Sequence, residues 1–514
     1  MTKKISYALI VIACLIAPML VAYATAPFGI GISEDSVAYI TMAQGIVRGI
    51  GPVSFDGSPI PDWPPLYPLL IATIKQLFSV TYDEAARLLN IVLYPAAIGL
   101  SAALIKHYTG SLAMAALGAI STAVYFPVFD MALYAFSELP FITLSLCLLV
   151  AINRYTEQLS MARLIVAALI AALLCLTRYT GIAVVGIVAL FLIIFHWRRR
   201  DALLKIGLSI ALYAVVALLP LGLWAARNFA LTGMPFGPRP PALATLELSL
   251  AQTVGTLVGW LLTLYGYQNI LFAAIMMLLL AAVAVLVRVH WRAFRRRLAA
   301  QPEGLLLTAL LSVLYTAFMI VSSVTTAFNA LNQRLLSPSA MPLLIFLLCS
   351  GYILFKVIPK KRKLIAYVLP LTAIFWIALN ALSLADGVGI VRAQGLYFNS
   401  VEWRKSALIA YVKDSPSFDD ATIYANKQSL LYFFLERPVY GTPSRTFFNS
   451  PQIASELNDD WLLDENGYVV WFSKWLDRQL YTLEELKTTA HFTLIASFDD
   501  GSIYHVRKHV ANDD

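Results

Sequence analysis

Long apolar runs separated by short polar segments make up the first three quarters of the chain. A helix that crosses a bilayer needs about 17 to 25 mostly apolar residues, and the pattern divides into about eleven such runs. The predicted spans are 5–26, 84–105, 111–127, 134–151, 164–176, 181–195, 203–225, 270–287, 305–327, 335–355 and 364–384. We therefore expect an α-helical polytopic membrane protein.

The composition agrees with this pattern. Hydrophobic residues make up 59% of the chain and charged residues 13%, and the mean hydropathy is +0.73, whereas soluble domains are about one quarter charged. An ordinary soluble protein is excluded. The cysteines all lie inside predicted spans, so we expect no disulfide in the polar part of the chain. They are Cys14, Cys147, Cys175 and Cys349.

The charge changes sign near residue 385. Residues 386–514 hold 12 basic and 18 acidic residues, whereas residues 1–385 hold 26 basic and 12 acidic residues. We therefore expect a transmembrane domain over 1–385 and a soluble domain over 386–514. Patterns in the second part predict a helix at 400–412, a tight turn at Asp499-Asp500-Gly501, and four strands. The strands are 422–425, 468–472, 492–498 and 502–506, which predicts a small α/β domain.

The basic residues also predict the orientation, because Lys and Arg accumulate at cytoplasmic ends of spans. Nineteen of the 26 fall into clusters that share one side if the N-terminus is cytoplasmic. This orientation requires a hairpin around 178–181 and an interfacial or re-entrant helix at 248–264. It also places the soluble domain outside the inner membrane. The first run is longer than the 7 to 15 apolar residues of a signal peptide, so an uncleaved helix is expected. The net charge of +8 thus reflects topology and not a nucleic-acid partner.

Seven basic residues remain at the outer face: Arg48, Lys75, Arg87, Arg178, Arg227, Arg239 and Arg334. Nine acidic residues of the first domain share that face. Ionisable groups near a membrane interface are candidates for function. The longest outer loop of this domain, 27–83, holds several of the acids.

The order of features in that loop resembles a known family. Asp35 follows the first helix, Tyr39 comes four residues later, and a Pro-Pro-Leu-Tyr-Pro segment occupies 64–68. This order resembles the glycosyltransferase superfamily C, in particular the bacterial branch related to protein O-mannosyltransferases and the lipid A aminoarabinose transferase. Supporting segments are 136–141, 177–181, 227–228, 232–233 and 332–338.

The resemblance implies transfer of a sugar from a polyprenyl-phosphate carrier to a lipid, glycan or protein acceptor at the outer face. It places Asp35 at the position of the family's catalytic acidic residue. Inversion at the anomeric carbon needs a carboxylate that takes the acceptor's proton as the phosphate leaves. We therefore expect Asp35 to be the base.

Glu138 corresponds by resemblance to the family's second acidic residue. It has three candidate roles: binding a divalent metal cation together with Asp35, orienting the acceptor, or holding an arginine. A structural carboxylate paired with Arg178 is an equally good interpretation, and Asp130 is the alternative acid in the same loop.

The leaving phosphate requires positive charge, and guanidinium groups suit phosphate oxygens. Arg178, Arg227 and Arg334 come from three outer loops and are the candidates for the carrier phosphate. Further candidates for substrate binding by the same resemblance are Glu34, Tyr39, Asp62, Trp63, Tyr67, Tyr179 and Asn228. The chain departs from many relatives, which have Asp-Glu at 35–36, and from the aminoarabinose branch, which has lysine at 63. These departures have two interpretations, an altered donor or, less favoured, an inactive relative.

Two other classes compete with an enzyme. A transporter or flippase of lipid-linked sugars commonly has internal repeats and ionisable groups at the bilayer midplane, whereas here the charges gather at one interface. A non-catalytic membrane assembly protein would not need Asp35. The pattern favours the enzyme.

Overall fold

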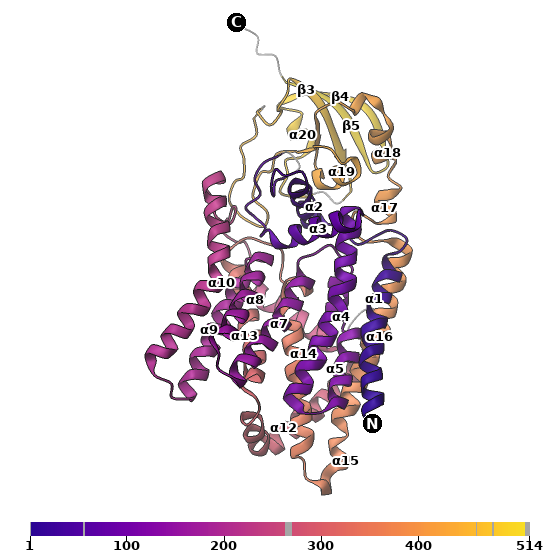
Figure 1. Cartoon of the computed structure of the whole chain (residues 1–514). Helices are drawn as coiled ribbons and strands as arrows, with labels where there is room; N and C mark the ends of the chain where they lie inside the picture. The colour runs from indigo at the N-terminus through magenta and orange to yellow at the C-terminus, as the bar shows by residue number, and fades with distance from the viewer. Residues whose placement is uncertain (1, 55–56, 263–269, 459, 475–476, 509–514) are drawn as a thin grey trace.

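The computed structural model describes residues 2–54, 57–262, 270–458, 460–474 and 477–508. A bundle of long helices carries a cap at one end, formed by the first outer loop and the C-terminal domain (Figure 1). The N-terminus and α15 (Lys363–Ala366) lie at the opposite end of the bundle.

The bundle contains the predicted membrane spans. Its helices, besides α15, are α1 (Lys3–Thr25), α4 (Tyr82–Thr109), α5 (Leu112–Val124), α6 (Phe126–Ala132), α7 (Glu138–Glu157), α8 (Met161–Thr177), α9 (Gly181–Arg198), α10 (Leu203–Thr232), α11 (Leu246–Leu262), α12 (Ile270–Ala299), α13 (Glu303–Thr325), α14 (Gln333–Val357) and α16 (Val368–Gln394). Within the described residues, nine helices are long and apolar enough to cross a membrane, with α15 and α16 counted as one, and the bent pair α5–α6 gives a tenth. Helix α8 has 17 residues and forms with α9 the predicted hairpin around 178–181. A multi-pass helical membrane protein is therefore confirmed.

Two predicted spans differ from the structure. The span 111–127 bends by 54° between α5 and α6, because Tyr125 is extended and a proline lies in the first turn of α6. The span 134–151 begins only at Glu138. Tyr134 instead forms a β-bridge with Gly31, so the backbone before Glu138 pairs with the first outer loop and is not helical.

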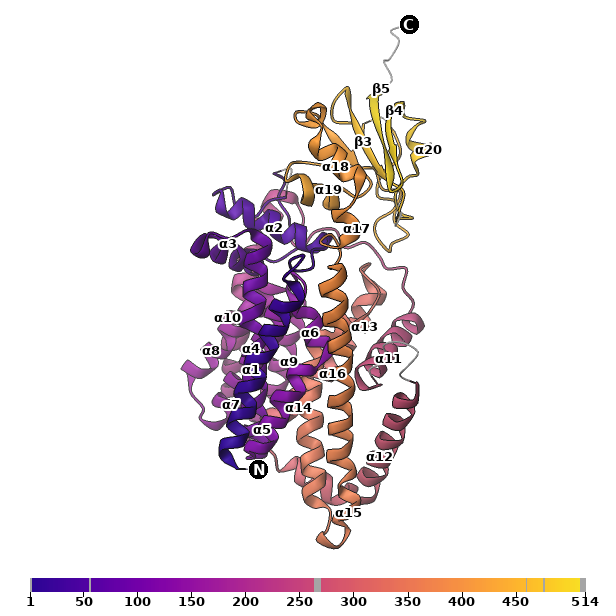
Figure 2. The ribbon, with the colours of Figure 1, turned by 90° about the vertical axis from the view of Figure 1, so that its right-hand side faces the viewer.

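The cap begins with α2 (Glu34–Val47) and α3 (Leu66–Phe78), which pack on each other above the bundle (Figure 2). The Ser33 hydroxyl caps α2 by accepting from the Ser36 amide at 3.4 Å. Glu34 and Asp35 lie in the first turn of α2, where carboxylates are favoured by the helix dipole. The polar start of α2 is thus fixed at the cap end of the bundle.

The C-terminal domain has one mixed sheet in the order β2-β1-β3-β5-β4. Its elements are α17 (Val401–Arg404), α18 (Ala407–Asp414), β1 (Ile423–Ala425), α19 (Gln428–Leu435), β2 (Tyr440–Gly441), β3 (Asn466–Phe472), α20 (Leu483–Leu486), β4 (Ala490–Phe498) and β5 (Gly501–Lys508). Strand β1 is parallel to β2 and β3, whereas β5 is antiparallel to β3 and β4. The predicted small α/β domain is confirmed.

The domain differs from the prediction in its helices. The predicted helix 400–412 is divided into α17 and α18, because the Ser406 hydroxyl accepts from the Ile409 amide at 3.0 Å and starts a new helix. Helix α19 and strand β2 were not predicted. Helix α16 also continues past residue 385 to Gln394.

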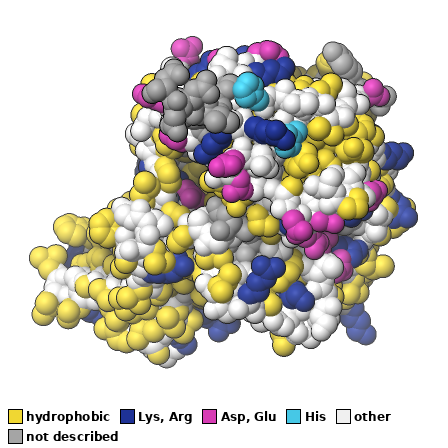
Figure 3. All heavy atoms as spheres, turned by 90° about the horizontal axis from the view of Figure 1, so that it is seen from above, with side chains coloured by type: hydrophobic (Ala, Val, Ile, Leu, Met, Phe, Trp, Pro, Cys, Tyr) yellow, Lys and Arg dark blue, Asp and Glu magenta, His cyan; other side chains and the backbone are white. Residues whose placement is uncertain are grey.

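The C-terminal domain and the first outer loop share one hydrophobic core. Val37, Ile40 and Ile71 from the loop belong to the same buried cluster as Leu431 and Phe472. Seen from above, charged side chains gather over the cap and hydrophobic ones cover the part that protrudes to the left (Figure 3).

Candidate functional site

Four predicted site residues meet where the cap joins the bundle. Asp35 lies in the first turn of α2, Glu138 begins α7, Arg334 is the second residue of α14, and Arg178 lies in the turn between α8 and α9. We call these four residues the ionic cluster. Because they come from four elements, their contacts depend on the tertiary fold and not on sequence proximity.

Arg334 connects the two carboxylates. Its Nε donates to Glu138 Oε1 at 2.6 Å, and its Nη2 donates to Asp35 Oδ2. The guanidinium carbon lies 4.0 Å from the centre of the Phe136 ring, a cation–π contact. The side chain of Glu138 is fully buried, whereas that of Asp35 is 27% exposed. Asp35 is therefore the carboxylate that a substrate can reach.

Arg178 approaches Glu138 from the other side. Its Nη1 lies 2.6 Å from Glu138 Oε1 and donates to Ser137 Oγ at 3.0 Å. Ser137 Oγ also lies 3.0 Å from the Tyr39 hydroxyl. Two positive charges thus balance two negative charges, and Tyr39 is tied to the cluster through Ser137.

Aromatic residues form a wall beside the cluster. The Tyr39 ring packs edge-on against Tyr67 and Trp63, with centroids 5.0 and 6.4 Å away. Burial raises the pKa of both tyrosine hydroxyls, with the Asp35 charge adding to the effect at Tyr39. Both hydroxyls are therefore protonated and act as neutral groups.

A second group, which we call the aromatic–arginine cluster, comprises the predicted residues Asp62, Tyr179, Arg227 and Arg239 together with Trp224. The Tyr179 hydroxyl donates to Pro61 O at 2.5 Å and accepts from Trp224 Nε1 at 3.0 Å. Arg227 lies 4.7 Å from the Trp224 ring, and Arg239 lies 5.7 Å from the Tyr179 ring. Burial raises the pKa of Tyr179 to about 12.

Asn228 and Asp62 shape this second cluster. Asn228 is fully buried, accepts from Arg227 Nη1 at 2.9 Å and donates to Pro235 O at 3.2 Å. Asp62 lies against Gly237, where an added Cβ would come within 2.2 Å of Asp62 Oδ1. Gly237 also has φ +73°, so glycine is needed here for both space and backbone conformation.

Two acids lie outside these clusters. Burial raises the pKa of Glu34, and so does the charge of Asp35, while Lys427 of the C-terminal domain opposes the shift. Asp130 accepts from Gln333 Nε2 at 2.8 Å. Asp130 is thus tied to the residue next to Arg334, whereas Glu138 contacts Arg334 directly.

The ionic cluster does not fit a metal held jointly by Asp35 and Glu138. The Arg334 guanidinium already contacts both carboxylates, and a cation placed between them would be repelled by it. Within the described residues, no group of three or more His, Cys, Asp or Glu side chains is arranged to hold a metal ion. The contacts agree instead with the interpretation that Glu138 holds arginines.

Several residues of the site were not identified individually from the sequence. Ser137 and Phe136 support the arginines, Trp224 supports Arg227, and Lys427 lies near Glu34. The spacing of Trp224 and Arg227, three residues apart on a helix, is a signal that places them on one face. Lys427 gave no such signal because it comes from the other domain.

An apolar groove lies within the bundle. It has a volume of about 410 Å³ and is lined by residues of α5, α11, α12, α14 and α16, including Leu347 and Gly351. Helix α14 therefore carries both Arg334 in its first turn and part of the groove.

Comparison with known proteins supports this architecture. The family model of the dolichyl-phosphate-mannose-protein mannosyltransferases matches residues 62–224, a segment that contains Glu138, Arg178 and Trp224. No curated protein matches the sequence.

Solved structures match over almost the whole chain. ArnT from Cupriavidus metallidurans in the apo state is 12% identical, with a TM-score of 0.60 and coverage of 96% of this chain and 97% of that one. The structure of ArnT bound to undecaprenyl phosphate matches with a TM-score of 0.58, at 12% identity and 98% coverage of each chain. The oligosaccharyltransferase of Archaeoglobus fulgidus, in complex with Zn and sulfate, is 12% identical, with a TM-score of 0.52 and coverage of 96% and 72%.

The matched family and these structures are glycosyltransferases, the class that the first outer loop predicted. The chain therefore has the fold of these glycosyltransferase superfamily C structures, and its residues 62–224 are similar to the mannosyltransferase family.

Proposed function

We propose that the chain transfers a sugar, with inversion, from a polyprenyl-phosphate carrier to a hydroxyl group of an acceptor at the outer face of the inner membrane. The observation that carries this proposal is the ionic cluster: an accessible carboxylate, Asp35, shares a guanidinium with a fully buried one, Glu138. A base and a phosphate ligand are thus adjacent, as a single displacement requires.

In this reaction Asp35 takes the proton of the acceptor hydroxyl. The acceptor oxygen forms a bond to the anomeric carbon while the bond from that carbon to the phosphate oxygen breaks. The electron pair leaves with the phosphate, whose added negative charge the arginines stabilise. No covalent sugar–enzyme intermediate forms, and no step passes through a metal.

Arg334 has to change partners for Asp35 to act. Glu138 is buried and accepts from Arg334 Nε, whereas Asp35 is only partly buried and accepts from Nη2. An incoming phosphate offers several oxygens to the guanidinium and competes with Asp35 for that end. Donor binding thus frees the Asp35 carboxylate, while Glu138 keeps the arginine in place as a positioning residue.

Arg227 is the second candidate for the carrier phosphate. Among the described residues it forms no ion pair with a carboxylate, and its charge lies over the Trp224 ring. Such a guanidinium attracts an anion without first losing a carboxylate partner.

The apolar groove along α14 fits part of the carrier's isoprenoid chain. This assignment is supported by the undecaprenyl phosphate bound in the ArnT structure. It is also supported by the apolar residues of the bundle helices that line the groove. Leu347→Trp fills the groove and is expected to raise the KM for a long-chain donor more than for a short-chain one. An equal effect on both donors contradicts the assignment.

We further propose that the N-terminus is cytoplasmic and the C-terminal domain extracytoplasmic. The basic clusters of the sequence and the position of the N-terminus opposite the cap support this orientation (Figure 1).

The test is transfer from radiolabelled polyprenyl-phosphate sugars by the purified full-length protein, with wild type compared with Asp35→Asn. A general base contributes about 100- to 10,000-fold, so a loss of that size is expected. Glu247→Gln, an exposed acid at the start of α11, is the matched control. Unchanged transfer by Asp35→Asn would contradict the assignment of Asp35 as the general base. Absence of transfer by the wild type with every donor would favour a transporter or an assembly protein.

A further inference from the structure

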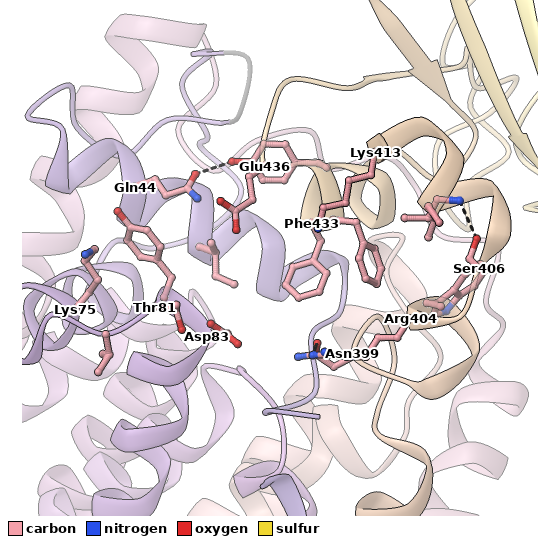
Figure 4. A pocket seen from close by; sticks show the side chains of 18 of the residues that line it. Gln44, Lys75, Thr81, Asp83, Asn399, Arg404, Ser406, Lys413, Phe433 and Glu436 are labelled. Atoms are coloured by element: carbon pink, nitrogen blue, oxygen red, sulfur yellow. Dashed lines mark hydrogen bonds between the residues drawn. The ribbon is translucent and has the colours of Figure 1, made fainter. Parts of the chain in front are cut away.

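A cavity of about 880 Å³ lies between α2, the start of α4 and the C-terminal domain (Figure 4). This volume is within the usual range for small-ligand sites, about 300 to 1,000 Å³. Gln44, which lines the cavity, follows Asp35 by nine residues on α2 and therefore lies about half a turn away around the helix. The cavity and the ionic cluster are thus on opposite faces of α2.

The cavity contains charges of both signs. Figure 4 shows Asp83 and Glu436 on facing walls, with Lys75 on the α3 side and Lys413 on the side of the C-terminal domain. In the part of the chain that the structure describes, none of these four side chains forms an ion pair. Arg404, by contrast, is committed to the fold, because it donates to Phe28 O and Asn399 Oδ1 at 2.9 and 2.8 Å.

Aromatic rings complete the lining. Phe433 and Phe434 pack edge to face with centroids 5.3 Å apart, and Tyr82 faces the cavity beside Lys75. Aromatic faces attract ammonium groups, and carboxylates accept their hydrogen bonds. The half of the cavity between Asp83 and Glu436 is therefore suited to a primary ammonium group.

The cavity lies beside an exposed apolar helix end and the start of a candidate membrane span. Helix α3 ends beside it with Leu77 and Phe78, which are 72% and 65% exposed, and the span α4 starts at Tyr82. Large exposed apolar side chains, like those at the end of α3, insert into the boundary between lipid headgroups and acyl chains when a helix lies on a membrane. Lipid headgroups of the outer leaflet are thus the molecules nearest to the cavity.

We propose that this cavity binds the zwitterionic headgroup of a membrane lipid, with a primary ammonium between Asp83 and Glu436 and a phosphate beside Lys75. The opposite charges of the lining disfavour a polyanion, and the unpaired charges disfavour an isoprenoid chain. The proposal does not depend on the catalytic role of Asp35.

Native mass spectrometry of the delipidated full-length protein tests the proposal, with phosphatidylethanolamine, phosphatidylcholine or phosphatidylglycerol added. We expect one phosphatidylethanolamine to bind at least tenfold more tightly than either other lipid. Phosphatidylcholine carries a cation that cannot donate hydrogen bonds to the carboxylates, and phosphatidylglycerol carries no cation. Equal binding of the three lipids overturns the proposal.

Variants locate the site. The double change Asp83→Asn and Glu436→Gln is expected to abolish the preference for phosphatidylethanolamine, whereas Asp420→Asn, an exposed acid outside the cavity, retains it. Thermal unfolding in detergent shows whether each variant is folded. A folded double variant that keeps the preference, or displacement of the lipid by a soluble saccharide, contradicts the proposal. Asp35→Asn should bind the lipid as wild type does, which separates this test from that of the transferase.

Discussion

The ionic cluster and the aromatic–arginine cluster both contain two arginines, but the guanidinium groups have different partners in the two clusters. In the ionic cluster, Arg178 and Arg334 share the buried carboxylate of Glu138, so their charge is balanced before any substrate arrives. In the aromatic–arginine cluster, Arg227 and Arg239 lie over the rings of Trp224 and Tyr179. A balanced arginine can exchange one anion for another, whereas an arginine on a ring remains available to attract one.

The largest effect is expected from Glu138→Gln, which breaks the ionic cluster. Removing one partner of a buried ion pair costs about 3–5 kcal/mol, because the remaining charges stay buried. Here two arginines lose their shared partner, so the melting temperature in detergent should fall markedly. Glu402→Gln is the control, since its pair with Lys474 at 3.3 Å is exposed and is worth at most about 1 kcal/mol. Equal melting temperatures for the two variants would refute the structural role of Glu138.

Arg227→Ala tests the other cluster. Loss of hydrogen bonds between a guanidinium and a phosphate costs about 1.5–3 kcal/mol, which corresponds to about 10- to 100-fold weaker donor binding. The free energy of unfolding should fall less than in Glu138→Gln, because Arg227→Ala removes the hydrogen bond to Asn228 Oδ1 but no ion pair with a carboxylate. Donor titration and thermal unfolding measure the two quantities separately. A large loss of stability with unchanged donor affinity would show that Arg227 has a structural role and does not bind the donor.

Tyr39→Phe is expected to have a smaller effect. It removes the hydrogen bond to Ser137 at 3.0 Å, worth about 1 kcal/mol, or about a fivefold loss in kcat/KM. Tyr67→Phe is the matched control, because the buried Tyr67 hydroxyl has no hydrogen-bond partner among the described residues. Kinetics of the two variants should therefore differ, and identical losses would show that only the aromatic wall matters.

Chelation of divalent cations is expected to have the smallest effect. Arg334 contacts both carboxylates of the proposed metal pair, so transfer should be unchanged after EDTA treatment. Transfer that is abolished by EDTA and restored by a divalent cation would show that a metal displaces the arginine.

The sequence predicted the spans well because bilayer thickness sets their length. It was less accurate where tertiary contacts override hydropathy, as at Tyr134, which pairs with the first outer loop and delays α7 until Glu138. Resemblance identified Asp35 and Glu138, but the residue that joins them, Arg334, is 299 positions from Asp35. Such a pairing depends on the packing of α2, α7 and α14, and no local pattern contains it.

That separation along the chain has a consequence for biosynthesis. Domains form from the N-terminus during synthesis, so Asp35 is made long before the helix that carries Arg334. A chain that stops before α14 has a carboxylate but lacks the arginine that joins it to Glu138. The complete arrangement thus exists only after α14 has been made, so it forms late in the synthesis of the chain.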